Sequence, residues 1–276
     1  MDVLLNDDEE MIRDGVRRFF TAECDTDRVR AIEDDEARTD PELWRQLAEL
    51  GWLGLALPSI YGGSEVPFTQ LTLLFEEAGR ALAPVPLHPH MVAALTLAEA
   101  VQRDDCGTLA ESLLSDACLG ESLLTWAWNE RLPNMGPEVV TLGAVADGNG
   151  WRLQGSKQMV EAFEIADYCL VAVRTDASQT GDGGITLLLV EPGAVGISSN
   201  AQRTLAGDRQ SEVRFDNVYV DGDALVGRVD AGWALARPML ERAMVLNCAM
   251  IVGATRRAAE RAFDYAKERV AFGHPI

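Results

Sequence analysis

The sequence predicts an α+β protein of several domains. An N-terminal helical domain is expected over residues 1–120, a middle antiparallel β-barrel or sandwich over 121–226, and a long helix over 227–276. Three observations lead to this prediction. Apolar residues recur at helical spacing through the first third of the chain, and short or period-two apolar runs replace that pattern near Glu121. A long helical pattern then resumes at Gly232.

The first helix is expected to begin at Asn6 or Asp7, because either side chain can accept a hydrogen bond from the backbone of the first turn. Its apolar face would contain Ile12, Val16, Phe19 and Phe20. Asp40 followed by Pro41 is a second start signal, since it joins an N-cap acid to a proline in the first turn. Gly51 is expected to end that helix.

Three further helices are expected before residue 120. Their apolar faces lie within residues 71–82, 91–101 and 109–117. Between the first two of these helices, clustered prolines predict a stiff connector. That connector would contain Pro84, Pro86, His88, Pro89 and His90.

Tight turns join the predicted strands of the middle domain. The segment Asp-Gly-Asn-Gly at residues 147–150 is typical of a hairpin turn, and residues 181–184 form a second loop of this kind. Strands connected this closely are antiparallel, which favours a small barrel or sandwich. The strand pattern ends near Val226.

The predicted long helix has no proline between Met239 and Tyr265 and would run about 45 Å. Pro238 suits its first turn. Two apolar stripes run along it, so we expect most of its circumference to be covered. One stripe contains Cys248, Val252, Ala259, Phe263, Ala266 and Val270, and the other contains Leu240, Met244, Ile251, Ala254, Ala258 and Tyr265.

Charged residues on this helix allow two interpretations. Glu241 and Arg242 are either a solvated pair that complements the helix dipole, or a carboxylate facing a cleft beside a reactive carbon with its neighbouring guanidinium. The basic residues near the far end form either a solvated face or a cradle for phosphates. These residues are Arg256, Arg257, Arg261, Lys267 and Arg269.

Composition limits the classes of partner. The net charge of -20 argues against nucleic acid or an anionic membrane as the main partner, but a small anionic ligand needs only a local basic site. Five scattered cysteines without a CxxC pair, and the lack of a signal-peptide pattern, favour a reduced cytoplasmic protein. The three histidines lack metal-ligand spacing, so no metal site is expected.

Four stretches resemble the acyl-CoA dehydrogenase family of flavoenzymes and together cover nearly the whole chain. They are LAELGWLGLALPSIYGG, GWRLQGSKQMVEAFEIADYCLVAVRT, SEVRFDNVYVDGDALVG and FDYAKERVAFGHPI. The resemblance implies an N-terminal helical domain, a middle β domain and the start of a C-terminal helical bundle. The sequence stops at Ile276, within that last domain, so we expect most of the bundle to be missing.

The resemblance implies a reaction in which FAD removes two hydrogens from an acyl-CoA thioester. A carboxylate in a dry cleft takes the α proton, and the flavin accepts the β hydride. In one branch of the family, that base is the Glu of a Glu-Arg pair in the long helix. Glu241 matches this position and is the implied catalytic residue, and Arg242 resembles a residue that contacts CoA.

The resemblance also implies cofactor contacts. Arg269 matches an arginine that reaches the FAD pyrophosphate of a neighbouring subunit, with Phe272 and Gly273 beside it. Leu124 and Thr125 are what remains of a stretch that wraps the pyrimidine edge of the flavin.

The flavin side of the predicted site departs from the family pattern. Met159, Val160 and Glu161 occupy the places of an aromatic residue, an isoleucine and a threonine. An ionised Glu161 cannot donate the hydrogen bond that a threonine gives, and it would add negative charge where reduced flavin forms.

The implied partners are an acyl-CoA substrate, of fatty acid or steroid side-chain type, and an electron-transfer flavoprotein as acceptor. We expect a homo- or hetero-oligomer with an acyl-CoA dehydrogenase subunit. Two alternatives to an active dehydrogenase follow from the departures in the flavin stretch. The chain could be a non-catalytic partner subunit, or an acyl-CoA-binding or scaffold protein without redox activity.

Overall fold

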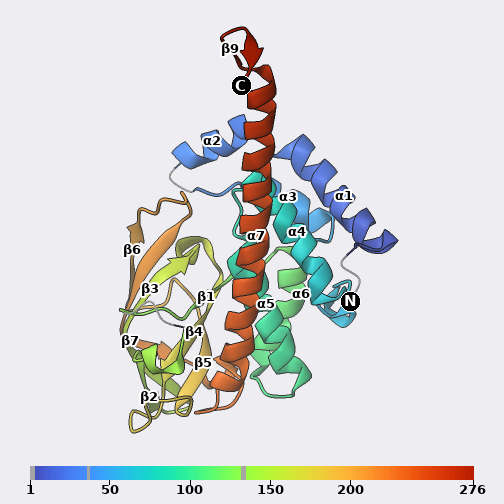
Figure 1. The fold of residues 1–276 in the computed structure, drawn as a ribbon. Coiled ribbons are helices and arrows are strands. Elements are labelled where there is room, and N and C mark those ends of the chain that lie inside the picture. The colour runs from blue at the N-terminus through green and yellow to red at the C-terminus, as the bar shows by residue number, and fades with distance from the viewer. Residues whose placement is uncertain (1–3, 36–37, 132–134) are drawn as a thin grey trace. The chain divides into compact units, whose positions relative to one another are not determined.

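The computed structural model describes residues 4–35, 38–131 and 135–276. Helices come first in the chain, strands follow, and a long helix comes next, as the sequence predicts; a short hairpin follows that helix (Figure 1). By compactness the chain divides into two units. One comprises residues 1–36, 67–84 and 244–276, and the other comprises residues 37–66 and 85–243. The predicted domain boundaries remain predictions.

The first unit contains α1 (Asp7–Glu23), α2 (Thr26–Asp34), α4 (Phe68–Ala81) and the later part of α7 (Trp233–Glu268). Asn6 is the N-cap of α1. Its side chain accepts from the backbone of Glu9, whose carboxylate accepts from the backbone of Asn6, both at 2.9 Å. This reciprocal pair decides between the two predicted caps in favour of Asn6.

Two features of this unit differ from the sequence prediction. Helix α2 was not predicted, because none of its residues is buried and it therefore lacks an apolar stripe. Leu82 was expected on the apolar face of a helix, but it caps α4 with a φ of 54° and its side chain is 62% exposed. The left-handed conformation at Leu82 turns its side chain away from the buried face of α4.

Helices α4 and α7 touch through two glycines. A Cβ atom built on Gly79 would lie 2.1 Å from the carbonyl oxygen of Met250, and one built on Gly253 would lie 1.8 Å from that of Glu76. Real Cβ atoms do not approach backbone this closely, so both positions require glycine. The single glycine in the apolar run of α7 is therefore the point where α4 crosses it closely.

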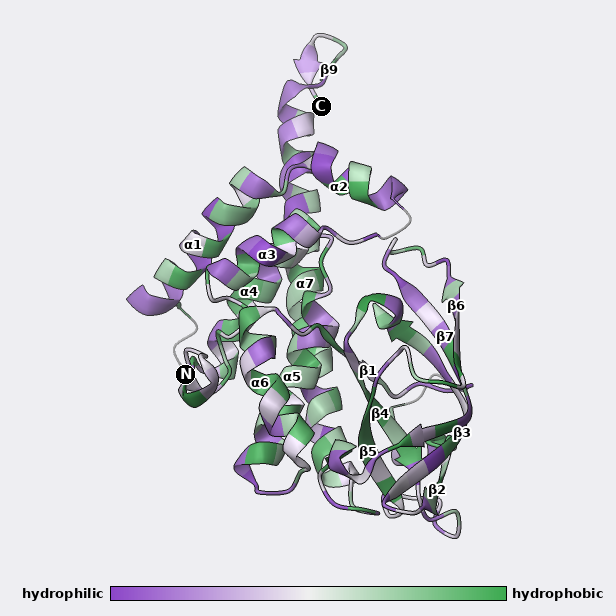
Figure 2. Cartoon of the chain, turned by 180° about the vertical axis from the view of Figure 1, so that it is seen from behind, coloured by the Kyte–Doolittle hydropathy of each residue, from purple (hydrophilic) through white to green (hydrophobic). Residues whose placement is uncertain are grey.

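The second unit contains α3 (Pro41–Glu49), α5 (Leu87–Gln102) and α6 (Thr108–Leu119). Asp40 caps α3 as predicted, because its side chain accepts from the backbone of Leu43 at 2.9 Å. Helix α5 is buried on most sides, and Figure 2 shows it largely in green. It begins at Leu87, earlier than predicted, so His88, Pro89 and His90 lie in its first turn and not in a connector.

Pro89 is compatible with a start of α5 at Leu87, since the first-turn N–H groups of a helix have no partner within the helix.

The strands of the second unit form one eight-stranded sheet in the order β6-β7-β3-β2-β4-β5-β8, with β1 paired to β4. Its strands are β1 (Leu124–Ala127), β2 (Gly143–Asp147), β3 (Gly150–Glu161), β4 (Tyr168–Arg174), β5 (Ile185–Val190), β6 (Ile197–Gln202), β7 (Gln210–Val220) and β8 (Leu225–Val226). The strands joined by short loops are antiparallel, as predicted. Strand β1, however, runs parallel to β4, and β2 meets β4 in parallel at one residue pair. The long connection from β1 to β4 permits this arrangement.

The predicted hairpin turn lies between β2 and β3. Asp147 and Gly150 are paired across the hairpin, and Gly148 has a φ of 61°. Strands β4 and β5 are likewise antiparallel, with Arg174 opposite Ile185 on either side of the second predicted loop. The two predicted turns are confirmed.

Helix α7 has 36 residues and begins at Trp233, earlier than a helix with Pro238 in its first turn would begin. Pro238 therefore lies inside the helix and not in its first turn. The early start is fixed by Gly232, whose carbonyl accepts from the backbone of Leu235 and Ala236. After α7, the short strands β9 (Val270–Ala271) and β10 (His274–Pro275) form a hairpin.

The expectation that most of the circumference of α7 is covered is wrong for the single chain. Several large apolar side chains of its later part are about half exposed or more, so the apolar stripes have no cover there. They are Met244, Val245, Ile251, Val252, Phe263 and Tyr265. In the described ranges of the chain, no helix combines the length and apolar character needed to cross a membrane.

We expect Gly253→Ala to destabilise the protein by ~1–3 kcal/mol, because the added methyl group must push α4 and α7 apart. The control is Gly15→Ala in α1, where a Cβ atom would meet nothing within 4 Å. That change should stabilise the helix by ~0.5–1 kcal/mol. Thermal unfolding followed by circular dichroism checks both. Equal melting temperatures for Gly253→Ala and the unmodified protein would contradict the close helix contact.

Candidate active site

The predicted flavin-facing residues of the second unit lie together at the ends of two strands. Leu124 and Thr125 are buried in β1. The hydroxyl of Thr125 donates to the carbonyl oxygen of Glu161, the last residue of β3, at 2.6 Å. This bond joins segments that are 36 residues apart in sequence. Because the Thr125 hydroxyl donates its proton to Glu161, that proton is not available to a ligand.

The end of β3 is irregular. Its pairing with β7 shifts register between Lys157 and Val160, and Met159 adopts a left-handed φ of 53°. Val160 is buried, whereas the side chain of Met159 is 44% exposed and that of Glu161 is 30% exposed. The bulge therefore presents a methionine and a carboxylate at the surface of the strand end.

His88 is the partner of Glu161 that the sequence analysis missed. It lies in the first turn of α5, and its Nδ1 atom is 3.5 Å from Oε2 of Glu161. Its Nε2 atom is 3.0 Å from the carbonyl oxygen of Ala243 in α7. The ring of Trp126 in β1 is 6.5 Å away. No local pattern links His88 to Glu161, since only the packing of α5 against β1 brings them together.

The charge of this pair changes the interpretation of Glu161. Burial by itself lowers the pKa of His88, but the hydrogen bond and negative charge of Glu161, with the carbonyl of Ala243, outweigh it and raise the pKa above its usual value. His88 is therefore more cationic near neutral pH than an isolated imidazole. A protonated His88 neutralises the carboxylate that the sequence analysis treated as uncompensated.

His90, two residues further along, is electrostatically different. Complete burial lowers its pKa to about 4, against a smaller opposite effect of the carbonyl of Ala117. Its Nε2 atom contacts that carbonyl, and its Nδ1 atom accepts from the backbone of Leu124 at 3.3 Å. His90 is thus a neutral side chain that holds β1 against α5.

Glu241 and Arg242 point in different directions from α7. The side chain of Glu241 is 57% exposed, and its carboxylate accepts from Arg237, one turn earlier, at 3.0 Å. The expected dry cleft is not formed around it in the single chain. Arg242 instead points toward α5 and pairs with Glu99. Its Nη1 atom is buried and has no acceptor among the described residues.

The predicted pyrophosphate contacts lie in the first unit. Arg269 follows α7 directly and is exposed. Phe272 and Gly273 form the turn of the β9–β10 hairpin with φ values of 54° and 83°, and Phe272 is fully exposed. The three residues are adjacent at the surface, and their role remains a prediction.

The residues at the end of β3 fit a flavin in two respects. Met159 offers an exposed apolar side chain. When His88 is protonated and Glu161 is ionised, the pair has no net charge. In the described part of the chain, no group of three or more histidine, cysteine or acidic residues is arranged to hold a metal ion.

Comparison with known proteins agrees with this architecture. The family models for the N-terminal, middle and C-terminal domains of acyl-CoA dehydrogenase match residues 6–108, 133–218 and 230–276. The chain belongs to the acyl-CoA dehydrogenase family. The family and the fold class predicted from the sequence are thereby confirmed.

Among the curated relatives, cyclohex-1-ene-1-carbonyl-CoA dehydrogenase of Geobacter metallireducens is 30% identical over 99% of this chain and 71% of its own length. The chain spans 61% of the length of acyl-CoA dehydrogenase FadE12 of Mycobacterium tuberculosis and 72% of that of benzylmalonyl-CoA dehydrogenase of Aromatoleum aromaticum.

Two solved structures are similar as well. A variant of the Tcur3481-Tcur3483 steroid ACAD is 33% identical, with a TM-score of 0.83 over 97% of this chain and 69% of that one. The ChsE4-ChsE5 complex of Mycobacterium tuberculosis is 26% identical, with a TM-score of 0.86 over 100% of this chain and 71% of that one.

We expect Glu161→Gln to lower the pKa of His88 below its ordinary value of about 6.5, because burial then acts without an opposing charge. A histidine NMR titration measures this directly, since the chain has only three histidines. Glu191→Gln, in the same unit, is the matched control and should leave the His88 titration unchanged.

The sign of the linked stability follows from the raised pKa. The pair stabilises the fold fully below the unfolded pKa of about 6.5, and this contribution is lost as pH rises through the folded value. If His88 titrates identically in the unmodified protein and in Glu161→Gln, the pair does not set its charge.

Proposed function

We propose that this protein takes part in the FAD-dependent α,β-dehydrogenation of an acyl-CoA thioester. The observation that supports this most is the convergence of Thr125, Met159 and Glu161, three positions assigned to the flavin from sequence alone, at the ends of two distant strands. When bound, FAD would accept the β hydride. An electron-transfer flavoprotein would then accept the electrons, as in the activity implied by the family.

In this proposal each of these side chains has a separate role in binding. Met159 lies against the flavin, and His88 neutralises Glu161 so that a reduced, anionic flavin meets no net negative charge. The buried and unpaired Nη1 donor of Arg242 binds an oxygen of the acyl-CoA. Arg269, Phe272 and Gly273 contact the FAD pyrophosphate of a neighbouring subunit.

Glu241 removes the α proton in this proposal. Because its carboxylate is exposed in the single chain, the bound substrate must shield it from water. A carboxylate acts as a strong base only when water is removed from it and the α carbon is close. An acyl chain lying over this face of α7 would cover the carboxylate and displace its contact with Arg237. The base would therefore be assembled on substrate binding and would not be preformed in the single chain.

We expect the purified protein to show visible flavin bands, or to gain them on addition of FAD. Glu241→Gln should reduce acyl-CoA oxidation by at least ~10²-fold with FAD still bound, because an amide cannot accept the α proton. Asp264→Asn, an exposed acid further along α7, is the control and should keep full turnover. A colourless protein that gains no flavin bands with FAD would count against the proposal.

A non-catalytic partner subunit is the second candidate, and one observation favours it. Glu241 is exposed and already paired with Arg237, as expected of a carboxylate with no catalytic role. The similar ChsE4-ChsE5 complex agrees with such an assembly. This chain would then supply Arg269 to the cofactor of its partner, and the partner would supply the base.

Co-expression with an acyl-CoA dehydrogenase subunit encoded beside it separates the two candidates. If the pair co-purifies and Glu241→Gln leaves its turnover unchanged, the base belongs to the partner. If Glu241→Gln abolishes turnover of the pair or of this chain alone, the base is Glu241. Failure to co-purify, with no gain in activity, rejects the partner-subunit function.

A further inference from the structure

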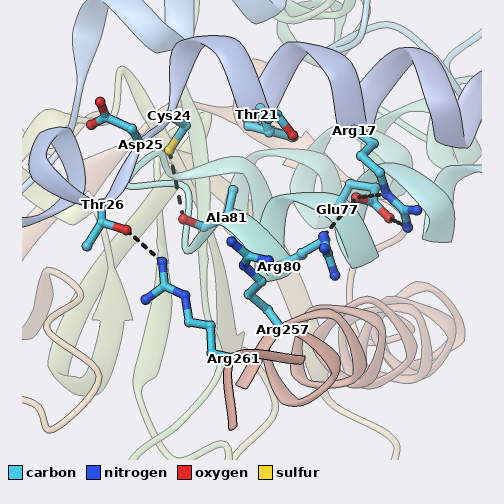
Figure 3. A pocket seen from close by; sticks show the side chains of 11 residues that line it. Arg17, Thr21, Cys24, Asp25, Thr26, Glu77, Arg80, Ala81, Arg257 and Arg261 are labelled. Carbon is cyan, nitrogen blue, oxygen red and sulfur yellow. Dashed lines mark hydrogen bonds and ion pairs between the residues drawn. The ribbon is translucent and has the colours of Figure 1, made fainter. Parts of the chain in front are cut away.

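A cavity of about 310 Å³ lies within the first unit, and four arginines line it (Figure 3). The walls come from α1, from the junction of α1 and α2, from α4 and from the later part of α7. Its polar lining includes Arg17, Thr26, Glu77, Arg80, Arg257 and Arg261. This volume is within the range of cavities that hold small molecules.

One side of the cavity is fixed by a buried carboxylate. Glu77 of α4 is 1% exposed and accepts two hydrogen bonds from Arg17 of α1, at 3.0 and 2.6 Å. The charge of Glu77 is therefore neutralised by Arg17. The bidentate contact also holds the Arg17 guanidinium in one orientation against the wall.

A second carboxylate serves two arginines. Glu260 of α7 accepts two hydrogen bonds from Arg80 of α4, at 2.7 and 2.5 Å, and a longer one from Arg257 at 3.3 Å. The contact with Arg80 is the stronger of the two by geometry. The guanidinium of Arg257 thus shares an acceptor that Arg80 already uses, and most of its donors are left for another partner.

Arg261 has no carboxylate partner among the described residues. Its Nη2 atom donates to the hydroxyl of Thr26 at 2.7 Å, a neutral acceptor in the first turn of α2. Arg257 and Arg261 are four residues apart and so lie on the same face of α7, where like charges repel. Figure 3 shows both side chains extending from α7 into the cavity, whereas Arg80 is turned toward Glu77.

The local charge balance is positive in a chain whose net charge is -20. Four guanidinium groups and two carboxylates, of Glu77 and Asp25, line the cavity, and the carboxylate of Glu260 accepts from two of these arginines. Asp25 accepts from the backbone of Arg28 as the cap of α2. The excess positive charge is concentrated at Arg257 and Arg261. An anion between them would remove their repulsion and satisfy their donors.

We propose that this cavity binds the phosphate group of a small phosphorylated molecule, with Arg257, Arg261 and the hydroxyl of Thr26 as its donors. Guanidinium groups match the geometry of phosphate oxygens in pairs, and a hydroxyl in the first turn of a helix adds a third donor on the favourable end of the helix dipole. Phe20 and Cys24 supply an apolar wall beside this group.

The proposed site shares no residue with the candidate active site. The active-site residues around His88 and Glu161 belong to the second unit, and the predicted pyrophosphate contact, Arg269, does not line the cavity. Phosphate binding here can therefore succeed or fail whether or not the proposed dehydrogenase function holds.

Isothermal titration calorimetry of the full chain with inorganic phosphate, pyrophosphate and ADP tests the site. We expect binding that weakens as salt rises. In Arg261→Gln, and separately in Arg257→Gln, the affinity should fall at least tenfold. Tighter binding of ADP than of pyrophosphate would assign a nucleotide, and equal binding would assign the phosphate groups alone.

A matched variant locates the binding. Arg256→Gln removes a neighbouring arginine that pairs with Glu76 outside the cavity. It should keep the affinity of the unmodified protein. Thermal melting temperatures confirm that each variant is folded. No binding of any probe at millimolar concentration, or equal affinity in Arg261→Gln and Arg256→Gln, would overturn the proposal.

Discussion

The buried ammonium group of Lys157 is the constraint on which the sheet and the candidate site depend. Lys157 lies on β3, is fully buried, and donates to Glu130 at 2.8 Å and to the carbonyl of Trp128 at 3.1 Å. Burial by itself raises the pKa of Glu130, but Lys157 and the donors of Thr141 and Leu142 outweigh it and hold the pKa below its usual range. Removing either partner of such a pair costs ~3–5 kcal/mol, because the other charge stays buried.

This pair also fixes where the site begins. Glu130 accepts from the backbone of Thr141 and Leu142, so the segment after β1 and the segment before β2 are both tied to β3 at Lys157. The register of β3 shifts immediately after Lys157, and the strand then ends at Glu161. The irregular end of β3 beyond Lys157 carries Glu161, whose carboxylate approaches His88.

The two sites differ in their balance of acidic and basic side chains. Around β3, acids and bases are matched, as Lys157 with Glu130 and His88 with Glu161. In the cavity of the first unit, arginines exceed carboxylates, and Arg261 is held only by the hydroxyl of Thr26. Matched pairs suit a site where charge appears during a reaction, whereas an excess of one sign suits a site that binds an ion.

The sequence by itself determined the order of the helical and strand regions, the cap at Asp40, the hairpin turn at residues 147–150 and the family, because each depends on neighbouring residues or on a contiguous motif. It also identified Glu161 as a carboxylate at a position where the family pattern has a threonine. Only the tertiary structure showed that His88 pairs with this carboxylate, since His88 and Glu161 are 73 positions apart along the chain. The parallel pairing of β1 and the cavity lined by Arg17, Arg80, Arg257 and Arg261 likewise depend on contacts between distant segments, which no local pattern encodes.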